Sequence, residues 1–316
     1  MSANLAALQL ETVRDDISRS NGLPAPLYVS PEWAERERDS VLANTWTAIG
    51  HASSVPVRHA QPVDLAGLPL VMVHDREGEL RVFHNVCRHR GHKLVNAEGA
   101  IEGAIRCPYH SWTYAMTGAL RGTPHIGGPG VHETAGFDKA AYGLKAVRSA
   151  VWFGVVFVNL SDDAPEFADH IAPLERRWAE FVGPNGISQL RVPEMHAHMQ
   201  FEVKSNWKLP VENYCESYHL PWVHPGLNSY SRLEDHYHIM EGQLGAGQGT
   251  LAFNFSNWEG ISLPQFSAWP SERRNVAEYL ALYPNVLLAL QVDHAYSIVL
   301  QPVAHNFTRE LVEVSY

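Results

Sequence analysis

The sequence predicts an α+β fold, in which a β-rich domain precedes a domain with an antiparallel sheet flanked by helices. Two short loops with metal-ligand residues lie between residues 80 and 118, where glycines and alternating apolar residues predict β-hairpins. Residues 206–219 have the start and stop signals of a helix, and apolar residues alternate over 311–316. We therefore expect three segments: a helical lead-in over 1–46 that packs on the last segment, a β domain over 47–160 and a larger domain over 161–316.

Composition and charge narrow the class of protein. The chain has 316 residues with 45% apolar and 10% aromatic content, which is typical of a globular protein. No stretch approaches the roughly 18 apolar residues of a membrane-spanning helix, and residues 1–4 lack the basic start of a secretion signal. The formal charge of −10 argues against a nucleic-acid partner, because phosphates attract basic surfaces. We expect a cytoplasmic protein that contacts neither membrane nor nucleic acid.

The first informative motif is a pair of loops that each contain one Cys and one His. Cys87 and His89 are separated by one residue, Cys107 and His110 by two, and seventeen residues lie between the pairs. In a Rieske-type 2Fe–2S cluster, two thiolates bind one iron and two neutral imidazoles bind the other. The same four residues could bind zinc tetrahedrally, although zinc fingers usually draw the Cys pair and the His pair from separate elements. The pattern favours the 2Fe–2S cluster, with a zinc-binding module as the alternative.

A second motif extends from Asn206 to His224. Asn206 is a favourable N-cap residue, and Pro221 is expected to end the helix just after His219. Glu216 and His219 then share one helical face with Glu212, and His224 can fold back toward the same point. Two His ligands and one carboxylate form the facial triad of non-haem iron(II) oxygenases. Two His residues near a Glu also occur by chance. The cluster motif upstream favours a metal here, because an electron-transfer centre needs an acceptor, and we predict a mononuclear iron held by His219 and His224.

The third iron ligand is not found in this chain. Asp293 is the nearest candidate, but it lies beside His294 in an expected hairpin turn, which explains the residue without a metal. Residues 311–316 read as a strand that the end of the chain interrupts. We expect a truncated chain whose missing part contains the carboxylate. The remaining cysteine, Cys215, is interpreted as a small packed side chain and not as a ligand.

The two motifs in this order resemble the catalytic α subunits of Rieske non-haem iron oxygenases, the ring-hydroxylating oxygenase family. The resemblance covers nearly the whole chain. It rests on the lead-in up to residue 46, the cluster domain over about 47–160, the Asn206–His224 motif and the segment Tyr283-Pro284-Asn285 with its following strand. The short spacing between Glu212 and Glu216 is similar to that in oxygenases of choline, carnitine and glycine betaine.

This resemblance implies a role for each matching residue. The 2Fe–2S cluster would be held by Cys87, His89, Cys107 and His110, and the mononuclear iron by His219 and His224. Glu216 stands where the family has an acidic bridge that bonds an iron-ligand His and a cluster His of a neighbouring subunit. Such a bridge fixes both imidazoles and shortens the path of the electron. Direct iron binding by Glu216 is the alternative, because a Glu three residues before a His can share a metal.

The implied protein is the terminal oxygenase component of an electron-transfer system. A head-to-tail ring, commonly a homotrimer, would bring the cluster of one chain to the iron of the next. A separate flavin and iron–sulfur reductase, or a ferredoxin, would supply electrons from NAD(P)H, and the iron would activate O2.

The substrate is expected to be a small quaternary ammonium compound, which this chain would hydroxylate or N-demethylate as a monooxygenase. Such cations bind well to aromatic faces, and the candidates are Trp222, Phe253, Phe255, Trp258, Trp269 and Tyr283. An aromatic ring-hydroxylating dioxygenase that forms arene cis-dihydrodiols is the alternative. A non-catalytic Rieske electron carrier is less well supported, because it would not need the second half of the chain.

Overall fold

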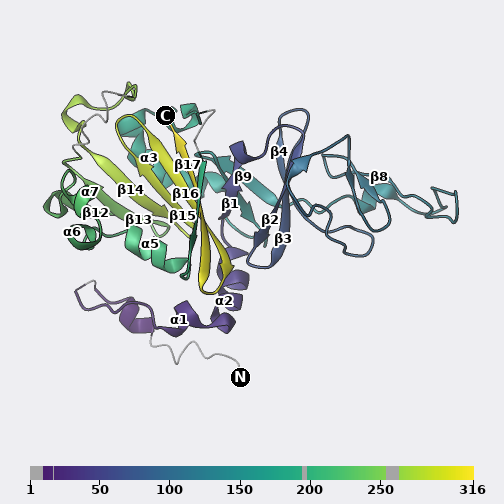
Figure 1. The fold of residues 1–316 in the computed structure, drawn as a ribbon, viewed down its shortest axis with the longest axis horizontal. Helices are drawn as coiled ribbons and strands as arrows, with labels where there is room; N and C mark the ends of the chain where they lie inside the picture. The colour runs from purple at the N-terminus through teal and green to yellow at the C-terminus, as the bar shows by residue number, and fades with distance from the viewer. Residues whose placement is uncertain (1–9, 17, 194–197, 254–262) are drawn as a thin grey trace. The chain divides into compact units, whose positions relative to one another are not determined.

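The computed structural model describes residues 10–16, 18–193, 198–253 and 263–316 (Figure 1). The chain divides into two compact units. One combines Met1–Ala48 with Asp163–Tyr316, and the other is Ile49–Asp162. The first unit combines α-helices with an antiparallel sheet, and strands predominate in the second, so the predicted α+β fold class is confirmed.

The first unit begins with short helices. A 3₁₀ turn spans Leu10–Val13, and α1 and α2 span Pro26–Val29 and Pro31–Glu37. The hydroxyl of Ser30 caps α2 by accepting a hydrogen bond from the backbone N–H of Trp33, and Pro31 follows at a position where no N–H is needed. A π-helical turn, Arg38–Leu42, continues α2. The side chains of Trp33 and Leu42 are buried.

A seven-stranded antiparallel sheet is the framework of this unit (Figure 1). Its spatial order is β11 (His198–Val203), β17 (Phe307–Ser315), β16 (Ala295–Ala304), β15 (Val286–Leu290), β14 (Ala277–Leu282), β13 (Gly245–Thr250) and β12 (His236–Glu241). Every residue of β15 is buried, which explains its continuous apolar sequence. The strand predicted over 286–290 is confirmed, and the alternating residues 311–315 belong to β17.

Helices contact both faces of the sheet. In α3 (Phe167–Val182), Arg177 and Trp178 donate hydrogen bonds to the buried carboxylate of Glu278 in β14. The next residue, Tyr279, points to the opposite face because side chains alternate along a strand, and its ring meets Tyr214 of α5 (Lys208–Tyr214). The shorter helical elements are α4 (Gly186–Gln189), α6 (Leu220–Val223), α7 (Pro225–Asn228) and the 3₁₀ turns Leu233–Asp235 and Ser271–Arg273.

The second unit is built of three small sheets. The first has the order β1 (Thr47–His51), β10 (Val155–Asn159) and β9 (Arg148–Trp152). The second has the order β4 (Leu80–His84), β3 (Leu68–His74), β2 (His59–Leu65) and β5 (Gly99–Ala100). The third has the order β6 (Ile105–Arg106), β7 (Thr113–Tyr114) and β8 (Leu120–Gly122). Short 3₁₀ turns span Ala52–Ser54 and Lys139–Tyr142. Strand pairing closes both ligand loops: Val86 bridges to Lys93, and β6 pairs with β7. The predicted hairpins are therefore confirmed.

The prediction of one continuous helix over 206–219 is wrong. Asn206 does cap the segment, since its side-chain oxygen accepts from the N–H of Lys208 at 3.1 Å. The helix nevertheless ends at Tyr214. The backbone carbonyl groups of Tyr214 and Glu216 accept hydrogen bonds from the side chain of Gln248 instead of continuing the helical ladder. Glu216 and His219 are therefore in an irregular turn between α5 and α6 and do not share a helical face.

Among the helices that the structure describes, none combines the length and apolar character needed to cross a bilayer.

Candidate metal centres and the adjoining cavity

The two ligand loops of the second unit have the same backbone geometry. The N–H of Cys87 donates to the carbonyl of His92 and the N–H of Cys107 to that of Trp112, both at 2.8 Å. In each loop, the N–H four residues after the Cys bonds back to the carbonyl of that Cys at 3.0 Å. That fourth residue has a positive φ, +74° at Gly91 and +57° at Ser111. Glycine adopts this conformation readily, whereas serine accepts some strain to close the second loop.

The thiols and the imidazoles form separate pairs. Cys87 and Cys107 are both about 2% exposed. Burial raises the pKa of the Cys107 thiol, the backbone N–H groups of Tyr109 and His110 lower it, and the neighbouring Cys87 raises it again. The rings of His89 and His110 lie with centroids 4.7 Å apart, and both residues are exposed. The candidate site thus has a buried pair of thiols and an exposed pair of imidazoles. These two pairs match the two ligand sets of a cluster with two irons.

The imidazole of His89 is well suited to a neutral ligand role. Its ring stacks on Trp112 with centroids 4.9 Å apart. Desolvation lowers the pKa of His89, and the neighbouring His110 and Arg90 lower it further. A lowered pKa favours the neutral imidazole, which is the form that binds metal. In the described part of the chain, no three His, Cys, Asp or Glu residues gather as a single-ion site.

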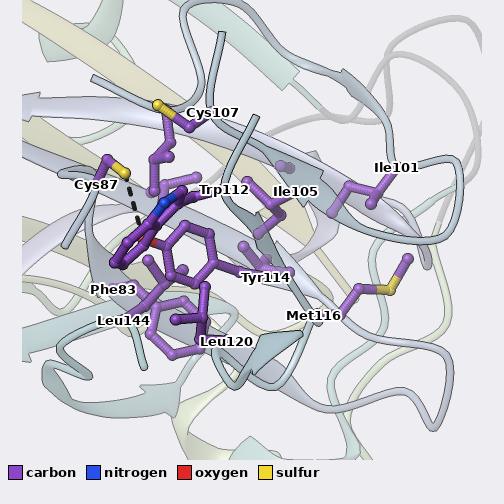
Figure 2. Close-up of a cluster of buried hydrophobic side chains, with 14 residues drawn as sticks. Phe83, Cys87, Ile101, Ile105, Cys107, Trp112, Tyr114, Met116, Leu120 and Leu144 are labelled. Carbon is purple, nitrogen blue, oxygen red and sulfur yellow. Dashed lines mark hydrogen bonds between the residues drawn. The ribbon is translucent and has the colours of Figure 1, made fainter. Parts of the chain in front are cut away.

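A tyrosine lies beside the buried thiol pair. The hydroxyl oxygen of Tyr114 is 3.2 Å from the sulfur of Cys87 (Figure 2). The same oxygen accepts a hydrogen bond from the N–H of Arg88 at 3.0 Å, which leaves the hydroxyl proton free to donate to sulfur. Figure 2 shows both sulfur atoms at the edge of an apolar cluster that includes Phe83, Ile105, Trp112, Leu120 and Leu144. These apolar side chains pack against the cysteines of both ligand loops.

The second candidate centre is in the first unit. The rings of His219 and His224 lie with centroids 5.3 Å apart and an interplanar angle of 77°. One carboxylate oxygen of Glu216 is 2.5 Å from Nδ1 of His219, and the other accepts from the backbone N–H of His219 at 3.2 Å. A proton on Nδ1 leaves the lone pair on Nε2, the atom that could bind a metal. Glu216 therefore has the geometry of a group that orients His219.

The third ligand of this centre is not among the described residues, where no set of three His, Cys, Asp or Glu residues could hold a metal ion. Asp293 bonds to Nδ1 of His294 at 2.7 Å. Both lie in the loop that joins the paired residues Leu290 and Ala295 of β15 and β16. The interpretation of Asp293 as a turn residue is thus confirmed. The side chain of Cys215 donates to the carbonyl of Ala246 at 3.5 Å and packs against the core of the sheet.

A cavity of about 180 Å³ adjoins His219 and His224. Its aromatic wall consists of Tyr214, Tyr279 and Tyr296, and its polar wall includes Ser231, His236 and Gln248. Burial raises the pKa of all three tyrosines above the ordinary value, so these rings are neutral phenols at physiological pH. The cavity thus has uncharged aromatic side chains on one wall and hydrogen-bonding side chains on another.

Sequence reasoning missed these tyrosines. Gln248 pairs with Tyr279, Tyr279 with Ala289, and Ala289 with Tyr296 across four neighbouring strands. Paired residues share a face of an antiparallel sheet, and the small side chain of Ala289 leaves space between the two phenol rings. The alternating strand patterns were visible in the sequence, but the register that aligns these residues was not.

The predicted aromatic residues lie elsewhere. Trp269 packs on Phe181, Phe253 contacts Tyr230, and Tyr283 is near Trp207. Trp222 is 68% exposed. None of these four lines the cavity. Core packing or a surface position, which the sequence already offered as the alternative for each, accounts for them. Phe255 and Trp258 lie outside the described residues.

Comparison with known families gives two matches. The model of the Rieske [2Fe-2S] domain matches residues 45–135, and that of the ring hydroxylating alpha subunit (catalytic domain) matches residues 190–316. The two ligand loops lie in the first region, and the His219 centre, its cavity and the sheet strands lie in the second.

Curated relatives have related printed functions. The carnitine monooxygenase oxygenase subunit of Escherichia coli K12 is 29% identical over 265 residues, which is 80% of this chain and 67% of the relative. The glycine betaine monooxygenase oxygenase subunit of Chromohalobacter salexigens is 32% identical over 218 residues, 68% of this chain and 46% of that protein. The biphenyl dioxygenase subunit alpha of Metapseudomonas furukawaii is 29% identical over 223 residues, 66% of this chain and 46% of that protein. The matches to the last two span about half of those proteins.

Solved structures share the fold. The quaternary ammonium Rieske monooxygenase CntA in complex with L-carnitine has a TM-score of 0.72 at 23% identity, covering 93% of this chain and 74% of that chain. Naphthalene 1,2-dioxygenase from Rhodococcus has a TM-score of 0.72 at 21% identity, with 93% and 73% covered. At these identities the likeness concerns the fold alone.

Proposed function

The chain belongs to the family of Rieske non-haem iron oxygenase α subunits, and we propose that it is a terminal oxygenase component that hydroxylates or N-demethylates a small quaternary ammonium compound with O2. The observation that carries the proposal is the presence of two separate centres of the expected ligand types, one with a carboxylate already bonded to a candidate iron ligand. Relatives whose printed names specify carnitine and glycine betaine support the substrate class.

We propose a role for each residue of the two centres. Cys87 and Cys107 would hold one iron of the 2Fe–2S cluster, and His89 and His110 the other. His219 and His224 would supply two ligands of the mononuclear iron through ring nitrogens. When bound, these groups transfer electrons and activate dioxygen. The chain itself shields the thiols by burial, keeps His89 neutral and orients His219 through the carboxylate of Glu216.

The cavity supports a cationic substrate. A quaternary ammonium group has no N–H to donate, so it gains most from the faces of aromatic rings. The rings of Tyr214 and Tyr279 are nearly perpendicular at 6.1 Å, and the hydroxyls of Tyr214 and Tyr296 are 3.4 Å apart. Three neutral phenols around about 180 Å³ of space suit a small cation beside the iron-site histidines.

The bridge is proposed to act between subunits. One Glu216 oxygen pairs with Nδ1 of His219, and the residue is partly exposed, so a carboxylate oxygen can also accept from a cluster His of a neighbouring chain. Three large apolar side chains, Tyr218, Trp222 and Val223, are 73%, 68% and 62% exposed close to this turn. Such a patch is typical of an interface. We propose a homotrimeric ring, and sedimentation analysis that gave a monomer at micromolar concentration would contradict it.

The remaining partners are proposed from the same chemistry. A separate reductase or ferredoxin would pass electrons from NAD(P)H to the cluster, whose imidazole end is exposed. We also propose a cytoplasmic location, which the three free thiols support, because disulfides are rare in that compartment.

The first test is EPR of the dithionite-reduced protein together with iron, sulfide and zinc analysis. A rhombic signal with a low average g value is expected for mixed thiolate and imidazole ligation. Zinc without this signal would overturn the proposal. The substrate class is then tested by coupled oxygen uptake and formaldehyde release with carnitine, glycine betaine and choline. Uptake that occurs with biphenyl or naphthalene, and not with the cations, would favour the arene dioxygenase alternative.

The substitution Tyr114→Phe is expected to lower the reduction potential of the cluster. A hydroxyl donor to a cysteine sulfur favours the reduced, more negative cluster. Loss of one hydrogen bond worth about 1 kcal/mol corresponds to a shift of about 20–60 mV. Protein-film voltammetry measures this shift, with Tyr142→Phe as the control because Tyr142 is a half-exposed tyrosine of the same unit. A potential that does not move in Tyr114→Phe would show that the hydroxyl does not donate to sulfur.

A further inference from the structure

One primary amide joins the turn that contains Glu216 to the wall of the cavity. Gln248, in β13, is only 7% exposed. Its Nε2 donates to the backbone carbonyl of Glu216 at 2.8 Å and to that of Tyr214 at 3.2 Å. Its Oε1 lies 2.8 Å from Nδ1 of His236. These three hydrogen bonds join the side chain to residues in or beside the cavity wall.

The orientation of the amide determines a histidine tautomer. Reversing the amide would place Oε1 against two carbonyl oxygens, which repel it, so the nitrogen must face Tyr214 and Glu216. Oε1 then requires a donor, and Nδ1 of His236 must carry a proton. In neutral His236, Nε2 is left as an acceptor for the hydroxyl of Ser231 at 2.9 Å. Ser231 is buried, and both it and His236 line the cavity.

The same amide also decides where α5 ends. In a continuing helix, the carbonyl groups of Tyr214 and Glu216 would accept from the N–H groups four residues later. Gln248 occupies both carbonyl groups, and the N–H of Leu220 bonds to the carbonyl of Ser217 instead, at 3.0 Å. The chain turns at this point, and the Glu216 carboxylate meets the imidazole of His219.

We propose that Gln248 is a positioning residue of the iron site: through one amide it holds the Glu216 turn in the conformation that orients His219, and it fixes the Nδ1–H tautomer of His236 in the cavity wall. This inference rests on the proposed roles of Glu216 and His219. It connects the residues that a substrate would touch with the residue that would transmit the electron.

Two variants of Gln248 distinguish the donor function of the amide from its acceptor function. Gln248→Glu keeps an acceptor for His236 but removes the donor to the carbonyl groups, and its charge repels them. Gln248→Leu removes both functions. We expect electron transfer from the reduced cluster, followed in a single turnover, to slow by about tenfold in each variant, as for loss of one or two positioning hydrogen bonds.

Histidine-selective ¹⁵N NMR of protein with an oxidised cluster and no iron at the second centre gives a readout independent of activity. In both variants the Nδ1–H signal of His219 should shift or broaden. The Nδ1–H form of His236 should persist in Gln248→Glu and be lost in Gln248→Leu. Ser231→Ala is the matched control: it removes the far end of the same chain of hydrogen bonds, and the His219 signal should not move.

Several outcomes would overturn the inference. Unchanged His219 signals in both Gln248 variants, or an equal change in Ser231→Ala, would show that the amide does not position the turn. Unchanged electron transfer in the variants would show that the Gln248 amide has no effect on the proposed Glu216 bridge. By contrast, a wild-type protein that loads both centres yet transfers no electron between them would contradict the proposed function, whatever the NMR signals of the variants show.

Discussion

Replacing Glu216 by Gln is expected to slow electron transfer from the cluster to the mononuclear iron by about 10- to 100-fold, the usual cost of losing a group that orients metal ligands. The glutamine oxygen can still accept from Nδ1 of His219, so this imidazole keeps its tautomer and both centres should keep their iron. The substitution removes one acceptor oxygen and the negative charge, which would stabilise the two imidazoles of the proposed bridge. Stopped-flow absorbance of the reduced cluster mixed with O2 and substrate measures the rate.

Glu212→Gln is a suitable control for this substitution. Glu212 lies one helical turn earlier in α5 and accepts a hydrogen bond from the hydroxyl of Tyr28 at 2.6 Å, away from His219. Its electron-transfer rate should stay close to that of the wild type. If Glu216→Gln transferred electrons normally, the bridge would be wrong. If it lost the mononuclear iron instead, the alternative of direct iron binding by Glu216 would be favoured.

Replacing Cys87 by Ser is expected to abolish the cluster, and with it all turnover that depends on reductase. Serine offers a hydroxyl that binds iron poorly at neutral pH, and the site is buried beside Cys107 and Tyr114. The brown colour, acid-labile sulfide and rhombic EPR signal should all fall to background. Circular dichroism and thermal unfolding would show whether the second unit keeps its fold without the cluster.

Cys215→Ser is the matched control, because Cys215 is the remaining cysteine and is a half-buried free thiol. Its sulfur bonds a backbone carbonyl, a contact that a serine hydroxyl can also make. The sulfide content and EPR signal should be those of the wild type. A Cys87→Ser protein with a full cluster, or a Cys215→Ser protein without one, would show that the ligand assignment is wrong.

Most of the cluster site was predictable because its ligands lie on two short loops. Spacing along the chain restricts where Cys87, His89, Cys107 and His110 can be, and the flanking strands predict hairpins. Once β6 pairs with β7 and Val86 bridges to Lys93, the loops have little conformational freedom. The contact between Tyr114 and Cys87 was not predicted, because it joins residues 27 positions apart through the packing of the cluster in Figure 2.

The second centre shows how far local patterns extend. Residue types and spacing singled out His219, His224 and Glu216, and the structure brings all three together. Periodicity alone placed Glu216 and His219 on one long helix, which the structure contradicts. The reason is that helix propensity counts only neighbouring residues, whereas Gln248 lies 32 positions after Glu216 and takes its carbonyl group out of the helical ladder.

The lining of the cavity could be predicted even less from the sequence, because it depends on tertiary structure. Aromatic residues could be counted in the sequence, but Tyr279 and Tyr296 face one space only because their strands pair in register through Ala289. A shift of one residue would turn both rings to the other face of the sheet. The sequence by itself thus predicted the candidate ligand types, the order of the two candidate centres and the resemblance to a family, since these depend on chemistry at close spacing. Tertiary structure alone decided the end of α5, the walls of the cavity and the tautomer of His236, because each of these depends on contacts that the register and packing of the sheet strands create.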